Sequence, residues 1–598
     1  MAEKIRSREE IAREDTWAME DLYASDAAWL EDLEKLKTLG AKLPEYAGKL
    51  SASAQTLLEY QKLGEEISVL LDSLANYAQR KSDEDTRNAV YQDLTGKLTK
   101  VWVQLGADTA FEVPELLSIS DEQMEKFYEE VPELNLYRRH FDSIRRKRAH
   151  VLSESEEKLL AMAGEMAGTP EEVYSLFADA DLTFRPALDA NGEEHPITQG
   201  SYIAAMESPD RTLRKNAFES LYAGFGAYKN TVAATLAGQV KQLEFFSKAR
   251  HYSSPLEASL DATEVPVSVY HELIEAVHQN MDKMHRYMRL RKKLLGVSEL
   301  HMYDLYTPLV AASEERIPFA EAKKTVAQAL GVMGERYGKI LQEGFENRWI
   351  DVYENTGKRS GAYSAGARVH PYVLLNYTGT LDSEFTLAHE MGHAIHSYLS
   401  NKTQPIVYSD YVIFVAEVAS TCNEALLMQH LLKTTTDKKQ RAYLINHFLE
   451  QFRTTLYRQT MFAEFELKIA ELSAQGVTLT ADVLCEEYRK LNALYYGEDV
   501  VLDEEIALEW ARIPHFYYNY YVFQYATGYA AAIALSEGIL KDGEPAVERY
   551  LGFLSGGCSK SPIELLKGAG VDMTTAEPVN QALAMFSKLL DEMEALTA

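Results

Sequence analysis

The sequence predicts a mainly α-helical protein with two lobes. Long segments across most of the chain carry apolar residues at the spacing of amphipathic helices, whereas signals of β structure are confined to two short patches. The chain has 598 residues, 46% of them hydrophobic, which is long enough for two or more domains and a large core. We place the domain boundary near residue 200, with a helical N-terminal domain at 1–200 and a second domain at 201–598.

The first part of the chain is predicted to consist of successive helices. Proline and glycine separate the segments with helical spacing, as expected at helix ends. Nothing in these helices points to catalysis. The segments are 26–38, 54–80, 84–112, 121–147 and 153–167.

The first β patch lies at 182–198. Apolar residues at 182–184 and 197–198 flank Asn191 and Gly192, a pair that favours a hairpin turn. We expect this hairpin to mark the junction between the two domains.

The second β patch lies at 349–380. Residues 371–377 are predicted to form a strand, and Asp382 or Ser383 is expected to cap the helix that follows. Such a strand is either an edge that pairs with an extended peptide or an ordinary supporting hairpin. The residues alone favour the two interpretations almost equally.

The helix after this strand carries the pattern H-E-x-x-H, with His389, Glu390 and His393. Residues i and i+4 lie on one face of a helix, so both histidines can bind one Zn²⁺ with the glutamate beside it. The ion would lower the pKa of a bound water, and the glutamate would take its proton as the water attacks a carbonyl. The flanking residues are apolar, which indicates a buried helix whose polar side chains need partners.

A third ligand is expected on a second helix. A metzincin would have Gly at 396 and His at 399, but the chain has His396 and Leu399, which excludes that class. Glu417 lies in an apolar segment more than twenty residues further on, where an unpartnered carboxylate is unfavourable. Glu424 follows seven positions later on the same helix face and can hydrogen-bond a ligand.

The composition argues against several classes of protein. The net charge is −30, and a surface this negative repels the phosphates of nucleic acids. The three cysteines are widely spaced and indicate no disulfide framework. No apolar leader and no 18-residue apolar run is present. We therefore expect a cytoplasmic protein that binds neither nucleic acid nor membranes; its oligomeric state is not predicted.

The motifs together resemble the oligoendopeptidase F group within the thimet oligopeptidase and neurolysin family of zinc peptidases. The resemblance is strong from about residue 200 to the end, with two similar segments near the start. The segments that carry it are H-E-M-G-H-A-I-H-S at 389–397, A-E-V-A-S-T-C-N-E at 416–424, G-A-Y at 361–363, P-Y-V-L-L-N-Y at 371–377, H-F-Y-Y at 515–518, T-W at 16–17 and D-L-Y at 21–23.

The resemblance implies an endopeptidase with one catalytic Zn²⁺, held by His389, His393 and Glu417, and with Glu390 as the general base. It also implies a deep channel that admits short unfolded peptides and excludes folded proteins. The second domain, 201–598, would then be the catalytic domain.

The resemblance favours substrate binding for the predicted strand at 371–377. Tyr372, Leu374 and Asn376 would be its contacts with the peptide.

An aromatic segment at 515–529 holds six tyrosines in fifteen residues. Aromatic residues at helical spacing more often belong to a hydrophobic core than to a functional site. Six buried tyrosine hydroxyls, however, would need six hydrogen-bond partners. The resemblance implies that His515, Tyr521 and Tyr525 contact substrate and stabilise the oxyanion, with Tyr518 as a further substrate contact.

This segment departs from the family pattern in two ways. The spacing from the histidine to the first tyrosine is longer by one residue, and Gly528 stands where the last tyrosine is expected. Tyr518, Tyr520 and Tyr529 therefore stay open as alternatives for the same role.

The alternative function is a non-catalytic helical protein with a structural zinc. A structural site usually closes with a fourth Cys or His, and His396 stands three residues after His393 as the one nearby exception. We predict that His396 is a buried, hydrogen-bonding histidine.

Overall fold

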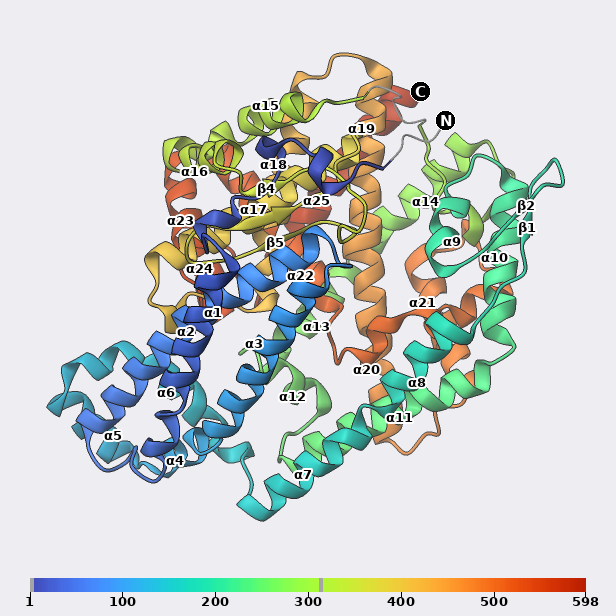
Figure 1. Cartoon of the computed structure of the whole chain (residues 1–598). Helices are drawn as coiled ribbons and strands as arrows, with labels where there is room; N and C mark the ends of the chain where they lie inside the picture. The colour runs from blue at the N-terminus through green and yellow to red at the C-terminus, as the bar shows by residue number, and fades with distance from the viewer. Residues whose placement is uncertain (1–4, 311–315) are drawn as a thin grey trace. The chain divides into compact units, whose positions relative to one another are not determined.

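The protein is mainly α-helical, which confirms the predicted fold class (Figure 1). The structure is a computed structural model that describes residues 5–310 and 316–598. The described part of the chain contains a two-stranded hairpin β1–β2, a parallel pair β3–β7 and a three-stranded sheet β4–β6–β5. Among the helices of this part, none combines the length and the apolar composition that a membrane span requires.

The chain divides into two compact units, and neither is continuous in sequence. The first unit comprises the described residues of Met1–Ala149, Glu315–Gln429 and Leu535–Gly570. Its helices and strands are α1 (Asp26–Gly40), α2 (Ala54–Glu84), α3 (Ala89–Asp108), α4 (Glu112–Ser118), α5 (Asp121–Glu130), α6 (Arg138–Arg146), α15 (Phe319–Ala329), α16 (Gly334–Glu346), β4 (Ile350–Asp351), β5 (Tyr363–Ala365), β6 (Tyr372–Leu374), α17 (Leu381–Thr403), most of α18 (Ile413–Thr434), α23 (Glu544–Leu554) and α24 (Pro562–Ala569).

The second unit comprises the described residues of His150–Glu314, His430–Ala534 and Val571–Ala598. Its elements are α7 (Glu154–Ala167), α8 (Thr169–Leu176), β1 (Ala187–Leu188), β2 (Glu194–His195), α9 (Gln199–Met206), α10 (Arg211–Gly226), α11 (Lys229–Ala249), α12 (Pro255–Asp261), α13 (Val267–His278), α14 (Met281–Leu295), β3 (Leu300–His301), α19 (Lys438–Gln451), α20 (Arg458–Ala474), α21 (Ala481–Tyr496), β7 (Val500–Val501), the first half of α22 (Phe523–Asp542) and α25 (Glu577–Thr597).

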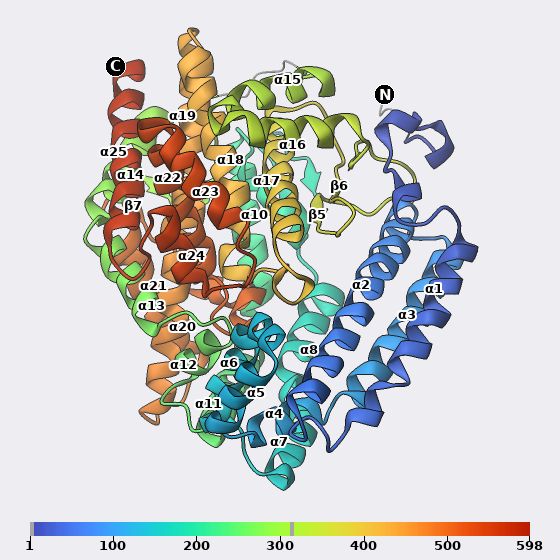
Figure 2. The ribbon, with the colours of Figure 1, turned by 90° about the vertical axis from the view of Figure 1, so that its left-hand side faces the viewer.

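The N-terminal helices share a unit with the H-E-x-x-H helix, a grouping that a division at residue 200 does not anticipate. Helices α1, α2 and α3 run side by side (Figures 1 and 2). Their buried residues form one hydrophobic core with Trp17 and with Tyr372 and Leu374 of β6. The apolar spacing of these helices therefore serves to cover the sheet.

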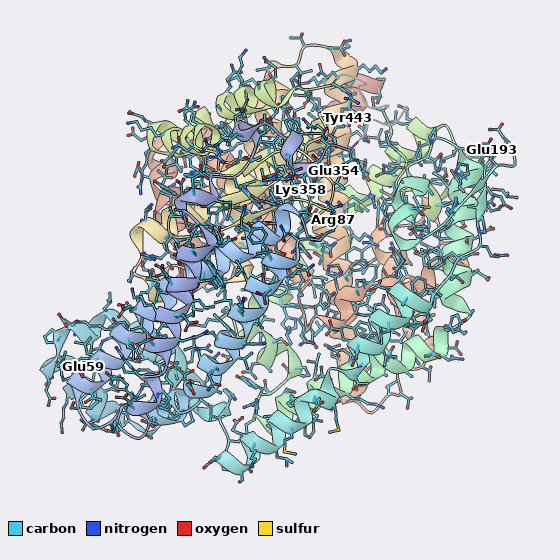
Figure 3. The ribbon with its side chains drawn as sticks, in the orientation of Figure 1. Glu59, Arg87, Glu193, Glu354, Lys358 and Tyr443 are labelled. Carbon is cyan, nitrogen blue, oxygen red and sulfur yellow. The ribbon has the colours of Figure 1, made fainter. Side chains whose placement is uncertain are left out.

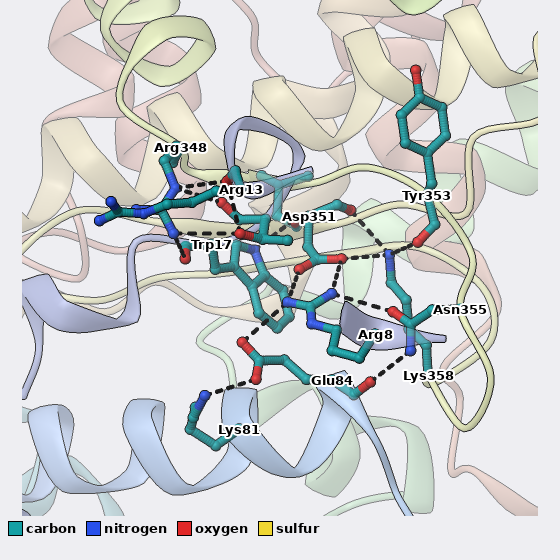
Figure 4. A network of polar contacts seen from close by, with 12 residues as sticks. Arg8, Arg13, Trp17, Lys81, Glu84, Arg348, Asp351, Tyr353, Asn355 and Lys358 are labelled. Atoms are coloured by element: carbon teal, nitrogen blue, oxygen red, sulfur yellow. Dashed lines mark hydrogen bonds and ion pairs between the residues drawn. The ribbon is translucent and has the colours of Figure 1, made fainter. Parts of the chain in front are cut away.

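Ion pairs around the buried carboxylate of Asp351 fasten the N-terminal segment to this sheet (Figure 4). Asp351, the last residue of β4, lies 2.7 Å from Nζ of Lys358, and neither side chain is exposed. Arg8 donates to the same carboxylate at 2.9 Å and pairs with Glu84 of α2 at 3.1 Å. Arg87, two residues before α3, donates to the carbonyl of Thr356 at 3.2 Å, in the loop that carries Lys358 (Figure 3). Charges removed from water need such partners, so the network ties these segments together.

The hairpin forms where the sequence predicts it but uses other residues. Strands β1 and β2 lie closer to the turn than the predicted flanks at 182–184 and 197–198. Gly192 has φ +82°, a left-handed conformation that favours glycine.

The cap of α17 differs from the prediction. Thr380 is the N-cap, and its side chain accepts a hydrogen bond from the backbone of Ser383. Asp382 and Ser383 both lie inside the first turn instead, so the expectation that one of them caps the helix is wrong. A threonine hydroxyl satisfies one of the free N–H groups at a helix start equally well.

Candidate metal centre and aromatic cluster

Helices α17 and α18 bring three candidate ligand atoms together within the first unit. The Nε2 atoms of His389 and His393 lie 3.4 and 3.5 Å from Oε2 of Glu417. Ligands about 2.1 Å from one tetrahedral ion lie roughly 3.4 Å from each other. The three predicted residues therefore have the spacing of a metal site and could hold an ion.

The electrostatics of this group also suit a cation. Burial alone would lower the pKa of His389, but the carboxylates of Glu417 and Glu424 raise it well above its usual value. Burial raises the pKa of Glu417, yet the two imidazoles outweigh it and hold that pKa below its ordinary range. Carboxylates that stabilise positive charge at this position would equally stabilise a metal ion.

Glu424 fixes the orientation of His389. Its Oε1 atom accepts a hydrogen bond of 3.0 Å from Nδ1 of His389, so Nε2 is the nitrogen that faces Glu417. A histidine that binds a metal usually has such a partner on its other nitrogen. The contact agrees with the position of Glu424 seven residues after Glu417.

Glu390 is buried beside these ligands, with 6% of its surface exposed. Its Oε2 atom has no hydrogen-bond partner among the described residues, and burial raises its pKa. A buried carboxylate oxygen without a partner is unfavourable in a purely structural position. It fits a group that hydrogen-bonds water or substrate.

Two residues that the sequence analysis missed set the distance between the helices. At Gly392 a side chain would meet Cα of Ser420 at 2.6 Å, so only glycine allows α17 and α18 to approach this closely. Asn423 donates to the carbonyl of Ala388 at 3.0 Å and accepts from the hydroxyl of Tyr337 at 2.7 Å. Gly392 lies within the segment 389–397 and Asn423 within the segment 416–424. The sequence patterns of these two segments do not indicate that either residue has a packing role.

His396 is buried, as predicted, but its contacts differ. Its ring stacks on Tyr411 with a centroid distance of 3.7 Å, and its Nδ1 atom has no hydrogen-bond partner in the described structure. Burial lowers its pKa to about 3, so the ring is neutral. His396 is not part of the candidate metal group of the described residues.

The strand at 371–377 has no free edge, so the expectation that it pairs with a peptide is wrong. Strand β6 is central, with β4 parallel on one side and β5 antiparallel on the other. Tyr372 and Leu374 are fully buried, and the hydroxyl of Tyr372 donates to the carbonyl of Ala18. Asn376 donates to the carbonyls of Arg359 and Gly361 and so supports the loop before β5.

The two edge strands of this sheet are β4 and β5, and β5 borders a cavity of about 660 Å³ in the first unit. The cavity extends to Ala416, the residue before Glu417. Its lining is rich in small polar and acidic side chains. It includes Asp72, Ser364, Ser397, Asp410 and Tyr411.

In the second unit, the predicted aromatic residues form one cluster. The ring of His515 lies 5.4 Å from Tyr518, 6.3 Å from Tyr521 and 6.1 Å from Tyr525. Tyr518 is 45% exposed and the other three are half-buried. The cluster thus presents polar aromatic groups at a surface.

The remaining tyrosines of this segment belong to the core. Tyr517, Tyr520 and Tyr529 are each 4% exposed. Some tyrosines of the aromatic segment at 515–529 therefore belong to the core and others lie at the surface. Because Tyr520 and Tyr529 are buried, they are no longer alternatives for an exposed residue that contacts substrate.

A sequence model described as "Peptidase family M3" matches residues 204–585, and one described as "Oligopeptidase F" matches residues 115–184. The chain belongs to peptidase family M3. The matched range of this M3 peptidase contains α17 and α18, which carry the candidate metal centre, and the aromatic cluster.

Individual relatives of this M3 peptidase match over nearly its whole length. Oligopeptidase PepF of Bacillus subtilis is 48% identical, covering 100% of this chain and 89% of that protein. An oligoendopeptidase F homolog of Lactococcus lactis is 42% identical, covering 99% and 98%. The crystal structure of oligoendopeptidase-F from Enterococcus faecium superposes with a TM-score of 0.74 at 38% identity, covering 96% and 99%.

Proposed function

We propose that this M3 peptidase is a zinc-dependent endopeptidase that hydrolyses internal bonds of short unfolded peptides. The observation that carries the proposal is the spacing of 3.4 and 3.5 Å between the two imidazole nitrogens and the Glu417 carboxylate. The names of its relatives, oligopeptidase and oligoendopeptidase, support peptides as substrates.

His389, His393 and Glu417 would hold the ion and leave one position open, as in catalytic rather than structural zinc sites. When bound, Zn²⁺ would polarise the scissile carbonyl and lower the pKa of a coordinated water. Glu390 would take a proton at its unpartnered Oε2 and pass it to the leaving amine. A buried carboxyl with a raised pKa suits both transfers, because its pKa lies nearer to neutral pH.

Glu424 would act through His389. Its hydrogen bond to Nδ1 keeps the proton on that nitrogen, and Nε2 then has the free lone pair that a metal requires.

The peptide would bind along β5, the edge strand of the three-stranded sheet that is half-buried, whereas the other edge strand, β4, is buried. An extended peptide can add to a free strand edge through backbone hydrogen bonds. The cavity between β5 and the start of α18 would receive its side chains. Tyr372 and Leu374 are buried, so in this assignment they do not contact the peptide directly. Asn376 instead supports the loop before β5 through its hydrogen bond to the carbonyl of Gly361.

The aromatic cluster would contact the substrate and stabilise the oxyanion. Tyr521 and Tyr525 lie 5.3 Å apart between ring centroids, so both hydroxyls can approach one group. A phenolic hydroxyl can donate a hydrogen bond to the oxygen on which negative charge develops. His515 and Tyr518 would complete this surface.

The proposal is tested by metal analysis of the full chain and hydrolysis of a quenched nonspecific peptide. We expect one zinc per chain, loss of hydrolysis on chelation and recovery on adding Zn²⁺. A Glu417→Ala variant should lose the metal. Purified protein without a stoichiometric divalent metal, or full metal retention in Glu417→Ala, would contradict the proposal.

A further inference from the structure

The loop that joins the 3₁₀ turn at Pro514–Tyr517 to α22 has an unusual backbone. Asn519 and Tyr520 have φ of +56° and +58°, so two successive residues are left-handed and neither is glycine. This conformation is strained for side chains with a Cβ, and most of all for a bulky residue such as tyrosine. Such strain persists only where the surroundings enforce it, and it concentrates at functional sites.

Two buried side chains contact the strained residues directly. Glu466 of α20 accepts a hydrogen bond of 3.2 Å from the backbone N–H of Tyr520. Gln239 of α11 donates to the carbonyl of Tyr517 at 3.0 Å and to the side-chain oxygen of Asn519 at 2.8 Å. Glu466 and Gln239 are 7% and 4% exposed, so water does not readily replace either contact.

The protonation of Glu466 suits a fixed, uncharged contact. Burial raises its pKa to about 8, and the hydrogen bond from Tyr520 lowers it only in part. At pH 7 the carboxyl is therefore mostly neutral. Its second oxygen, Oε2, has no partner among the described residues and can carry the proton. A glutamine at this position would keep the acceptor without the charge.

The left-handed pair decides which way the tyrosines point. Tyr517 stacks on Tyr174 at 4.5 Å and Tyr520 lies edge-on to Tyr270 at 5.9 Å, both inside the unit. Tyr518 is exposed and Tyr521 is half-buried, and both rings lie beside His515. A return of Tyr520 to negative φ would redirect the chain on either side of it and separate these rings.

We propose that Glu466 and Gln239 are positioning residues that hold Asn519 and Tyr520 in the left-handed conformation and thereby aim Tyr518 and Tyr521 at the peptide substrate. The part of this inference that concerns substrate rests on the proposed function. The part that concerns the loop does not, and it can be tested without peptide hydrolysis.

The loop is tested first by limited chymotrypsin digestion of the native full chain. Chymotrypsin cleaves after exposed aromatic residues, and mass spectrometry of the fragments reports the nick after Tyr518. Glu466→Met removes the hydrogen-bond acceptor but keeps the side-chain volume. Local opening of the loop then no longer has to break a buried hydrogen bond, so we expect nicking to be roughly tenfold faster than in the wild type. Glu466→Gln should be nicked at the wild-type rate.

Glu464→Met is the matched control on the same helix. Glu464 contacts His278 at 2.8 Å and the hydroxyl of Tyr495 at 2.9 Å, and neither of these residues belongs to the loop. Its loss should lower the melting temperature without changing the nick after Tyr518. Gln239→Met removes the hydrogen bonds from Gln239 to the loop. It provides a second test of the inference if Glu466→Met does not fold. Wild-type nicking rates in both Met variants would overturn the inference.

The role toward substrate is tested by the kinetics of peptide hydrolysis. We expect kcat/KM to fall about tenfold or more in Glu466→Met and Gln239→Met, mainly through kcat, and to recover in Glu466→Gln. Glu464→Met should keep wild-type kcat and KM. Faster nicking with unchanged kcat/KM would overturn the role toward substrate. If the Met variants are nicked faster but the wild-type protein hydrolyses no peptide, the proposed function is overturned and the loop assignment stands.

Discussion

Nδ1 of His389 lies 3.0 Å from Oε1 of Glu424, while Nε2 of the same ring faces Glu417 at 3.4 Å. One imidazole is thus held between two carboxylates of α18, seven residues apart on one helix face. This arrangement makes the orientation of the candidate ligand His389 depend on Glu424, which would not itself touch a metal ion.

Glu424→Leu should weaken metal binding by roughly 10- to 100-fold, because the His389 ring loses the partner that fixes its orientation and tautomer. Glu424→Gln keeps an acceptor and should lose less. Competition with a chromogenic chelator measures both affinities. Equal affinity in wild type and Glu424→Leu would show that the contact does not support the site.

Glu390→Gln should retain the metal and lose peptide hydrolysis by about 10²–10⁴-fold, because the amide has nearly the same shape but cannot accept a proton. Metal analysis and hydrolysis of a quenched peptide check the two expectations together. Near-normal turnover in this variant would mean that Glu390 is not the base.

Tyr521→Phe and Tyr525→Phe should lower kcat by roughly 10²–10³-fold for whichever hydroxyl stabilises the oxyanion, with little change in melting temperature. Tyr529→Phe is the control, because Tyr529 is buried in the same segment. It should affect stability rather than kcat. If neither Tyr521→Phe nor Tyr525→Phe changes kcat, the oxyanion role of the cluster is wrong.

Glu384 should make stability fall as pH rises. It is 2% exposed near the start of α17, and burial raises its pKa from 4.5 to about 7, which a hydrogen bond from Thr325 opposes. The folded state therefore favours the protonated form. The stability that the protonated Glu384 contributes is fully present below pH 4.5 and is lost as pH rises through 7. A pKa difference between 4.5 and about 7, at 1.36 kcal/mol per pKa unit, makes this loss of unfolding free energy up to about 3 kcal/mol.

Glu384→Gln should remove this pH dependence. Urea unfolding at pH 5, 7 and 9 measures it as the difference between wild type and variant. Asp382→Asn, at an exposed position in the same helical turn, is the control and should leave the pH dependence unchanged. A parallel loss of stability in wild type and Glu384→Gln would assign the dependence to other groups.

Short unfolded peptides should be hydrolysed, while folded proteins and long flexible chains such as casein should be spared. The expectation comes from the enclosed channel that the family resemblance implies. Size-resolved peptide mixtures followed by mass spectrometry would give the upper length limit. Efficient digestion of casein by the homogeneous enzyme would contradict it.

The sequence by itself determined the helical class and the candidate metal group of His389, His393 and Glu417. Helical periodicity is local, so four residues between His389 and His393 suffice to place them on one face. Glu417 could be inferred because a carboxylate in an apolar helix needs a partner. The role of the aromatic segment at 515–529 was predicted only through the resemblance to a peptidase family, in which this segment accompanies the H-E-x-x-H motif.

Only the tertiary structure decided how these parts meet. Whether the strand at 371–377 is central or an edge depends on β4 and β5, which pair with it from elsewhere in the chain. The close approach at Gly392 depends on the backbone of Ser420. The left-handed Tyr520 depends on Glu466, 54 residues earlier. Each is set by contacts between distant segments, and local sequence patterns carry no direct signal for contacts that form only when the chain packs.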